Sequence, residues 1–176
     1  MDKKELGFEC EKAIGFLTKY MINDGWKKPA LFHVVRVGTH LFEQNYGRDI
    51  VIAGFLHDVL EDGTDVSENM IDVEFGNSVL QIVKANSKNE DINDKQKKKE
   101  DLINRCIVTG KSACIVKAGD ILDNFFYYEM TQNKDELLRH CVPHAQLLLS
   151  KLPDKYAGRI FQRLSSKMDE VVSVYI

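Results

Sequence analysis

The chain has 176 residues, of which 44% are hydrophobic and 29% charged, which is typical of a folded globular protein and excludes a disordered one. Its formal net charge of −3 gives no electrostatic basis for sequence-independent nucleic-acid binding. No apolar run approaches the ~20 residues that span a bilayer, and the polar N-terminus lacks a signal-peptide core. We therefore expect a cytoplasmic protein that binds neither nucleic acid nor membrane.

The length predicts a single domain over residues 1–176 that can bury a sizeable core without disulfide bonds or structural metal ions. The four cysteines are scattered and form no CxxC pair, so we expect them to be reduced and mostly in the core. Nothing in the sequence indicates the oligomeric state.

Helical periodicity runs through nearly the whole chain, whereas alternating β-branched runs with hairpin turns hardly appear. An apolar stripe begins at Leu6 and ends at Met21, and Pro29 stands where the next helix would start. Ser67 and Gly76 are the expected N-cap and C-cap of a short helix. Helices are predicted over residues 6–21, 30–46, 49–61, 67–75, 77–87, 111–129 and 134–152, and from Pro153 towards Tyr175.

These patterns predict an all-α, single-domain helical bundle of roughly eight or nine helices. The helix over 49–61 contains the run IVIAGFL, which is apolar on all sides, so we expect it to be central. The highly charged stretch 87–101 is expected to be a solvated loop and helix start. His140 and His144 are interpreted as surface or packing residues, and Arg36 has no assigned role.

The stretch FLHDVLEDGT concentrates ionisable groups at the end of the central helix. Residues three and four apart share a helix face, so His57, Asp58, Glu61 and Asp62 can all face one cleft. Three carboxylates at the negative end of a helix dipole repel one another, and a divalent cation would turn that repulsion into binding. Imidazole with carboxylate suits Mn²⁺, Fe²⁺, Co²⁺ or Zn²⁺ better than Ca²⁺ or Mg²⁺.

Two further ligands would have to come from elsewhere in the chain. His33 lies early in the second helix. Asp120 lies in CIVKAGDILDN, where an acidic residue again follows a mainly apolar run. Either residue alone is more often structural, but together with His57 and Asp58 they have the order His, His-Asp, Asp.

This order resembles that of the HD-domain metal-dependent phosphohydrolases. Within that superfamily, HDVLEDGTDVSENMIDVEFGNSVLQIVKANSK resembles the HDxxEDT segment of the RelA/SpoT-type alarmone hydrolase domains, and KAGDILDN resembles their KxADxxxN segment. The resemblance covers about residues 24–128, which would form the motif-bearing core, with C-terminal helices over 133–176 packing on it.

The resemblance implies a site and a reaction. The metal ligands would be His33, His57, Asp58 and Asp120, and the ion most often Mn²⁺, with Fe²⁺, Co²⁺, Zn²⁺ or Mg²⁺ as alternatives. Glu61 and Asp62 match the acid pair that positions and activates the attacking water. Asn124 matches a late Asn near the nucleotide. The implied substrate is a guanosine alarmone such as ppGpp, which would lose its 3′-diphosphate as pyrophosphate.

Basic side chains would hold the phosphates, and Lys117 is the favoured one because it lies three residues before Asp120. Lys88 and the 97–99 run are further candidates. Before His33 the family usually has an R-K-S-G-E-P-Y-like stretch, where this chain reads DGWKKPALFH, and Lys28 there could serve a different nucleotide pocket. An HD-type nucleotidase on another nucleotide is therefore the alternative function, and a non-catalytic metal- or nucleotide-binding regulatory module a lesser one.

Overall fold

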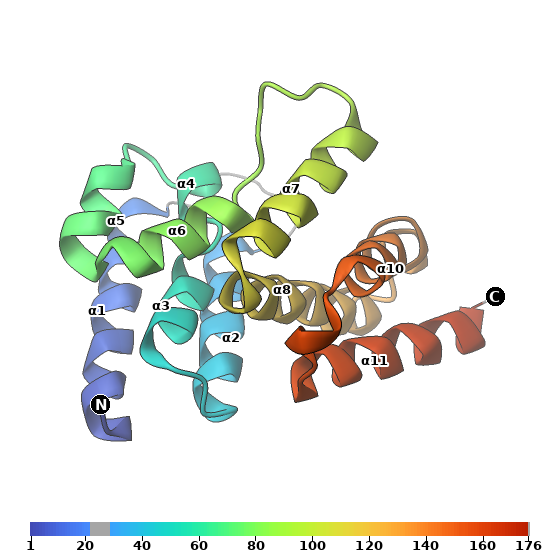
Figure 1. The fold of residues 1–176 in the computed structure, drawn as a ribbon, viewed down its shortest axis with the longest axis horizontal. Coiled ribbons are helices and arrows are strands. Elements are labelled where there is room, and N and C mark those ends of the chain that lie inside the picture. The colour runs from blue at the N-terminus through green and yellow to red at the C-terminus, as the bar shows by residue number, and fades with distance from the viewer. Residues whose placement is uncertain (22–28, 176) are drawn as a thin grey trace.

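A computed structural model describes residues 1–21 and 29–175, and within them every regular element is a helix (Figure 1). Nine of the helices in this part of the chain have eight residues or more, so the predicted all-α class is confirmed. The elements are α1 (Lys3–Tyr20), α2 (Ala30–Glu43), α3 (Arg48–Leu56), α4 (Val59–Asp62), α5 (Glu68–Phe75), α6 (Asn77–Asn86), α7 (Lys95–Thr109), α8 (Lys111–Met130), α9 (Lys134–Glu136), the π-helical η1 (Leu137–Cys141), α10 (Val142–Lys151), the 3-10 turn η2 (Asp154–Tyr156) and α11 (Arg159–Tyr175).

Local capping chemistry sets several helix ends. Asp2 and Glu5 form a reciprocal capping box at the start of α1. The Ser67 hydroxyl accepts from the Met70 amide at the start of α5, and Gly76 ends that helix with a φ of 94°, as the sequence predicts. α2 ends at Glu43 and not at 46, because Asn45 adopts the left-handed conformation with a φ of 61°.

The predicted helix over 49–61 is wrong in one respect that matters for the site. It divides into α3 and α4, and the break falls at His57 and Asp58. The Gly54 carbonyl, which would accept from the Asp58 amide in a continuous helix, lies 2.8 Å from Nδ1 of the His57 ring. Asp58 has a φ of −99° and a ψ of 0°, in the bridge region of backbone conformation. The sequence thus interrupts its most apolar helix at the two candidate ligands.

The C-terminal third also differs from prediction at its two prolines. The predicted helix over 134–152 contains a π-helical segment, η1, in which the Val142 amide bonds to the Leu137 carbonyl just before Pro143. Proline has no amide to donate and crowds the carbonyl four residues back, so the wider turn accommodates it. Pro153 opens the 3-10 turn η2 and not the last helix, which begins at Arg159.

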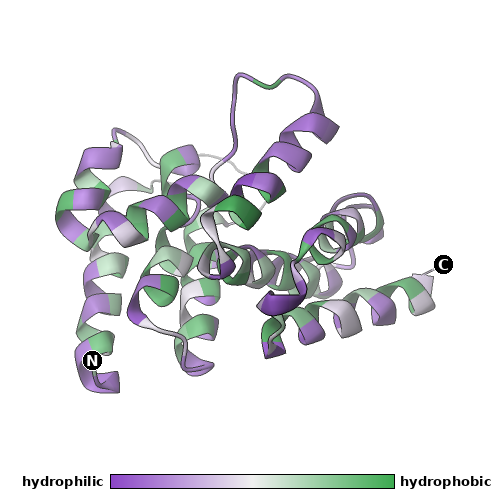
Figure 2. Ribbon diagram, viewed as in Figure 1, coloured by the Kyte–Doolittle hydropathy of each residue, from purple (hydrophilic) through white to green (hydrophobic). Residues whose placement is uncertain are grey.

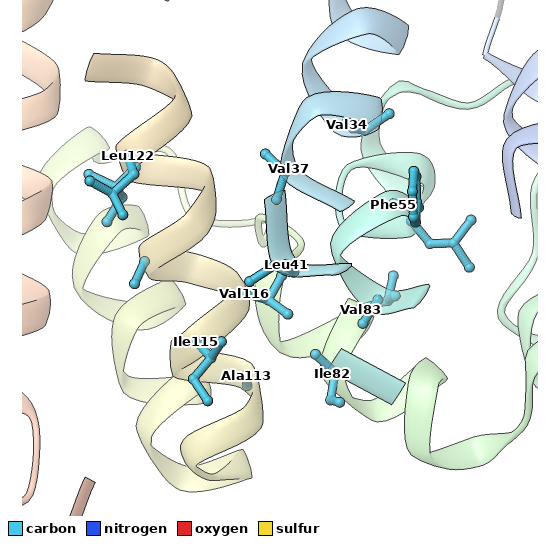
Figure 3. Close-up of a cluster of buried hydrophobic side chains, with 14 of the residues drawn as sticks. Val34, Val37, Leu41, Phe55, Ile82, Val83, Ala113, Ile115, Val116 and Leu122 are labelled. Carbon is cyan, nitrogen blue, oxygen red and sulfur yellow. The ribbon is translucent and has the colours of Figure 1, made fainter. Parts of the chain in front are cut away.

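The core lies where α2, α3, α6 and α8 meet, and Figure 3 shows side chains of all four helices gathered there. Val37 and Leu41 of α2 pack against α8 at Gly119. All six residues from Val51 to Leu56 are buried, so α3 is central as predicted. α1 and α6 pack on α3, and α10 and α11 pack on α8. Figure 2 shows the hydrophilic start of α7, which belongs to the charged 87–101 stretch.

No helix among the described residues combines the length and the apolar character needed to cross a bilayer.

Candidate metal centre and cleft

Two buried histidines face each other across α2 and the end of α3. His33 and His57 are both fully buried, with ring centroids 5.2 Å apart. Nδ1 of His57 lies 2.8 Å from the Gly54 carbonyl, and Nδ1 of His33 lies 2.6 Å from the Asp123 carboxylate. Each acceptor holds a proton on Nδ1, so in the neutral rings the Nε2 atoms carry the lone pairs.

The two Nε2 atoms point at the same carboxylates. His33, His57 and Asp58 each offer one ligand atom, and these atoms lie within 4.8 Å of one another. Asp58 lies 3.6 Å from Nε2 of His33 and 3.4 Å from Nε2 of His57. Oδ1 of Asp120 is 3.1 Å from Nε2 of His33 and 3.8 Å from that of His57. Three segments far apart in sequence, which carry His33, the adjacent His57 and Asp58, and Asp120, thus meet at one point.

This arrangement fits a divalent cation. Nε2 of His57 is buried and has no hydrogen-bond partner within residues 1–21 and 29–175, and a buried polar atom without a partner costs free energy. Metal bonds of about 2.1 Å place neighbouring ligand atoms about 3 Å apart, close to the separations above. Imidazole nitrogens with carboxylate oxygens form the donor set of a first-row transition ion.

Asp120 is held in place from both sides along α8. Nζ of Lys117 lies 3.0 Å from its Oδ2, and the Asn124 amide donates to its Oδ1 at 2.8 Å. Burial alone would raise the pKa of Asp120, but the Lys117 ammonium, with the neighbouring His33 and His57, holds that pKa well below its usual value. Asp120 is therefore an anion available to a metal.

The predicted acid pair lies beside this cluster on α4. Glu61 accepts from both the backbone amide and the ammonium group of Lys88, in the loop after α6. Burial lowers and the Glu61 charge raises the pKa of Lys88, and the net shift is upward. Gly63 ends α4 tightly, since a Cβ there would meet the Val59 carbonyl oxygen at 2.3 Å. Glu61 is thus fixed in orientation, with Asp62 next to it.

One cleft of about 230 Å³ connects these groups. Its wall includes Asp58, Asp120, both acids of α4, Lys88, Lys117 and Asn124. It also includes Tyr128, His140 and His144, and this corrects the interpretation of the two histidines as surface or packing residues. Of the other basic candidates, the 97–99 run is not part of this wall among the described residues, and Lys28 lies outside them.

Sequence reasoning missed Asp123 and Arg36. Asp123 was hidden because it lies in the DILDN run among other polar residues, and Arg36 because its partner is 87 positions away. Their spacing does carry a signal: Arg36 is three residues after His33, and Asp123 is three after Asp120, so each lies one turn from a candidate ligand.

Fold and site together define a helical domain built around a His, His-Asp, Asp cluster. The profile of the HD domain family matches residues 17–140, and the chain belongs to that family. An HD domain implies a bound divalent metal, in keeping with the His-His-Asp group above.

Three known proteins are similar to this chain. A probable guanosine-3′,5′-bis(diphosphate) 3′-pyrophosphohydrolase of Mycoplasma pneumoniae is 32% identical over 108 residues, which are 55% of this chain and 15% of that protein. The chain therefore spans only a small part of that relative's length. A solved structure described as a metazoan ortholog of SpoT that hydrolyzes ppGpp matches with a TM-score of 0.73 and 23% identity over 94% of both chains. The Listeria monocytogenes protein lmo0812 matches with a TM-score of 0.66 and 18% identity over 80% of this chain and 94% of the other.

Proposed function

We propose that the protein is a metal-dependent phosphohydrolase that acts on a nucleotide, and that its substrate is a guanosine alarmone such as ppGpp. The observation that carries this proposal is the convergence of two Nε2 atoms and two carboxylates, with Nε2 of His57 lacking a hydrogen-bond partner in the described residues. The substrate is suggested by the Mycoplasma pneumoniae relative, which is named as a probable 3′-pyrophosphohydrolase of that nucleotide.

In this proposal His33, His57, Asp58 and Asp120 hold the ion, and their imidazole and carboxylate groups suit Mn²⁺, Fe²⁺, Co²⁺ or Zn²⁺. Among these we expect Mn²⁺, which the resemblance to the alarmone hydrolases implies. When bound, a divalent ion neutralises charge on phosphoryl oxygens and lowers the pKa of water. The single HD-type domain over residues 1–176 would then supply both the metal site and the cleft that holds the phosphates. A cytoplasmic location is supported by the four cysteines, which are buried and form no disulfide in the described residues.

Glu61 and Asp62 would align the attacking water and accept its proton. Glu61 suits this role because two hydrogen bonds from Lys88 fix its carboxylate at the cleft wall. The water oxygen adds to the phosphorus next to the 3′ oxygen, the bond between that phosphorus and the 3′ oxygen breaks, and the 3′ oxygen takes up a proton. The products are a guanosine nucleotide and pyrophosphate. Lys117 and Asn124, which contact Asp120 at the cleft wall, would border the bound phosphates, and Lys28 is a further candidate for binding substrate.

The test is a Mn²⁺-supplemented panel of ppGpp, GDP, GMP and AMP, with pyrophosphate and phosphate measured separately and bound metal quantified. We expect pyrophosphate from ppGpp with the natural chain. Asp58→Ala should lose both metal and turnover because it removes a ligand. Glu61→Gln should retain the metal and lower kcat by about 100-fold or more, the usual contribution of a general base.

Glu68→Gln is the matched control, because Glu68 also pairs with a lysine, Lys84, but is not part of the cleft wall among the described residues. Its kcat should equal that of the natural chain. Phosphate released only from monophosphates would favour the nucleotidase alternative. Normal turnover by Glu61→Gln would show that Glu61 is not the proton acceptor.

A further inference from the structure

Behind the metal cluster, a second layer of charged side chains continues outward from His33. Nδ1 of His33 lies 2.6 Å from Oδ2 of Asp123, and both side chains are buried. Because a carboxylate accepts hydrogen bonds, this contact requires the His33 proton to be on Nδ1. The edge of the ring that carries Nε2 then points towards Asp58 and Asp120.

Asp123 is itself held by a two-point contact. Nε of Arg36 donates to its Oδ1 at 2.7 Å, and Nη2 donates to its Oδ2 at 2.6 Å. The guanidinium lies 4.6 Å from the Phe32 ring centroid and 5.7 Å from that of Tyr127, so cation–π contacts limit its movement. A bidentate Arg–carboxylate pair fixes the plane of the carboxylate as well as its position.

The two layers are built from the same two helices. α2 supplies His33 and, one turn later, Arg36; α8 supplies Asp120 and, one turn later, Asp123. Of the inner pair, Asp120 lines the cleft and His33 is fully buried behind it, whereas the outer pair lines a separate groove of about 620 Å³. Among the described residues Arg36 is not part of the cleft wall, so a change there alters no cleft contact directly.

We propose that Asp123, oriented by Arg36, is a positioning residue for His33: it fixes the tautomer and ring plane that present Nε2 to the metal. This inference rests on the proposed function, since it assumes that His33 is a metal ligand. The bidentate contact pairs the Asp123 carboxylate with a guanidinium, which is always charged. An anionic acceptor on the far nitrogen makes a ligating imidazole more basic, and loss of such a partner typically weakens metal binding 10–100-fold.

The test measures binding of Mn²⁺ alone, by electron paramagnetic resonance of the free ion, in the full chain without any nucleotide. We expect Asp123→Asn to raise the Mn²⁺ dissociation constant by about 10–100-fold. The asparagine keeps the shape of Asp123 but loses its charge and can turn an NH₂ group towards His33. Arg36→Lys keeps the positive charge but loses the two-point contact, so it should raise the dissociation constant by a smaller factor.

Glu9→Gln is the control, because Glu9 forms a comparable interhelical carboxylate contact with Arg48, at 3.2 and 2.6 Å, between α1 and α3. It should leave the Mn²⁺ dissociation constant unchanged. The absorption spectrum of bound Co²⁺ gives a second readout, and it should change in Asp123→Asn and not in Glu9→Gln.

The outcomes separate this inference from the proposed function. If the natural chain binds no Mn²⁺, the proposed metal site and the positioning role fail together. If the natural chain binds Mn²⁺ and folded Asp123→Asn binds it equally well with an unchanged Co²⁺ spectrum, Asp123 only stabilises the fold and the inference is overturned. Should Asp123→Asn fail to fold, Arg36→Lys decides, and an unchanged dissociation constant there overturns it as well.

Discussion

At the scale of single residues, His144 illustrates how tertiary packing sets the charge of a group in the cleft. Its Nδ1 lies 2.8 Å from the His140 carbonyl, and the two rings are 4.3 Å apart. Burial, followed by the charge of His140, lowers the pKa of His144 from 6.5 to about 3. His144 is therefore a neutral imidazole at physiological pH, with its proton on Nδ1, and it presents only an acceptor nitrogen elsewhere.

The neutral state of His144 predicts a pH dependence of stability. Between pH 6.5 and about 3 the unfolded chain binds a proton at this position that the folded chain does not, so acidification in this window lowers the free energy of unfolding. Replacement His144→Gln removes that contribution. From pH 7 to pH 5 the natural chain should lose about 2 kcal/mol more unfolding free energy than the variant. Urea unfolding at both pH values measures the difference, and equal losses would mean that the fold does not lower the pKa of His144.

At the scale of elements, a close approach of α2 and α3 brings the two halves of the metal cluster together. Gly38 of α2 faces Phe55 of α3, and a Cβ at this glycine would lie 2.3 Å from the phenylalanine ring. Gly54 of α3 likewise faces Leu41, at 2.5 Å from its Cδ1. Because both helices lack side chains at the contact, α2 carries His33 close to the end of α3, where His57 lies.

Replacement Gly38→Ala should therefore destabilise the protein by about 1–3 kcal/mol, since the added methyl group forces a buried ring aside in a packed core. The control is Gly15→Ala, in the middle of α1, where a Cβ would meet no atom within 4 Å. Alanine costs less backbone entropy than glycine in a helix, so this change should stabilise by about 0.5–1 kcal/mol. Denaturant unfolding of the two variants measures both values, and a Gly38→Ala protein as stable as the natural chain would contradict the close contact.

The differences between predicted and observed elements follow from non-local causes. Periodicity identified α1, α5, α6 and α8 because their apolar stripes are regular along the chain. It could not reveal the break at His57, which depends on a side-chain contact with the Gly54 carbonyl. The π-helical η1 is equally hidden, since periodicity cannot show how the chain accommodates Pro143.

The candidate site, like the fold, could be predicted from the sequence only in part. Residue order indicated His33, His57, Asp58 and Asp120, because it resembles the order of the HD-domain phosphohydrolases. The spacing of Arg36 and Asp123 places each one turn from a candidate ligand, but it cannot show that these two residues, 87 positions apart, pair with each other. Likewise, His140 and His144 reach the cleft only through the packing of α10 on α8.

At the scale of the whole molecule, the candidate metal cluster couples cation binding to folding. Folding brings the Asp58 and Asp120 carboxylates and two Nε2 lone pairs to one point, where the carboxylates repel each other and Lys117 pairs with Asp120. In the unfolded chain only the adjacent His57 and Asp58 stay close together, so no complete site exists there. A divalent ion that binds only the folded state therefore stabilises the whole domain.

Addition of Mn²⁺ at about 100 times its dissociation constant should stabilise the natural chain by about 2.7 kcal/mol. For a domain of this size that corresponds to a rise of roughly 5–10 °C in melting temperature, measured by differential scanning calorimetry against a chelator-treated sample.

Asp58→Ala should show no such rise, because a ligand is missing. In the presence of chelator the same variant should melt no lower than the natural chain, because it lacks one of the repelling carboxylates. Glu9→Gln, which leaves the cluster intact, should melt lower under both conditions and keep the full response to Mn²⁺. If Mn²⁺ leaves the melting temperature of the natural chain unchanged, metal binding at this cluster is contradicted.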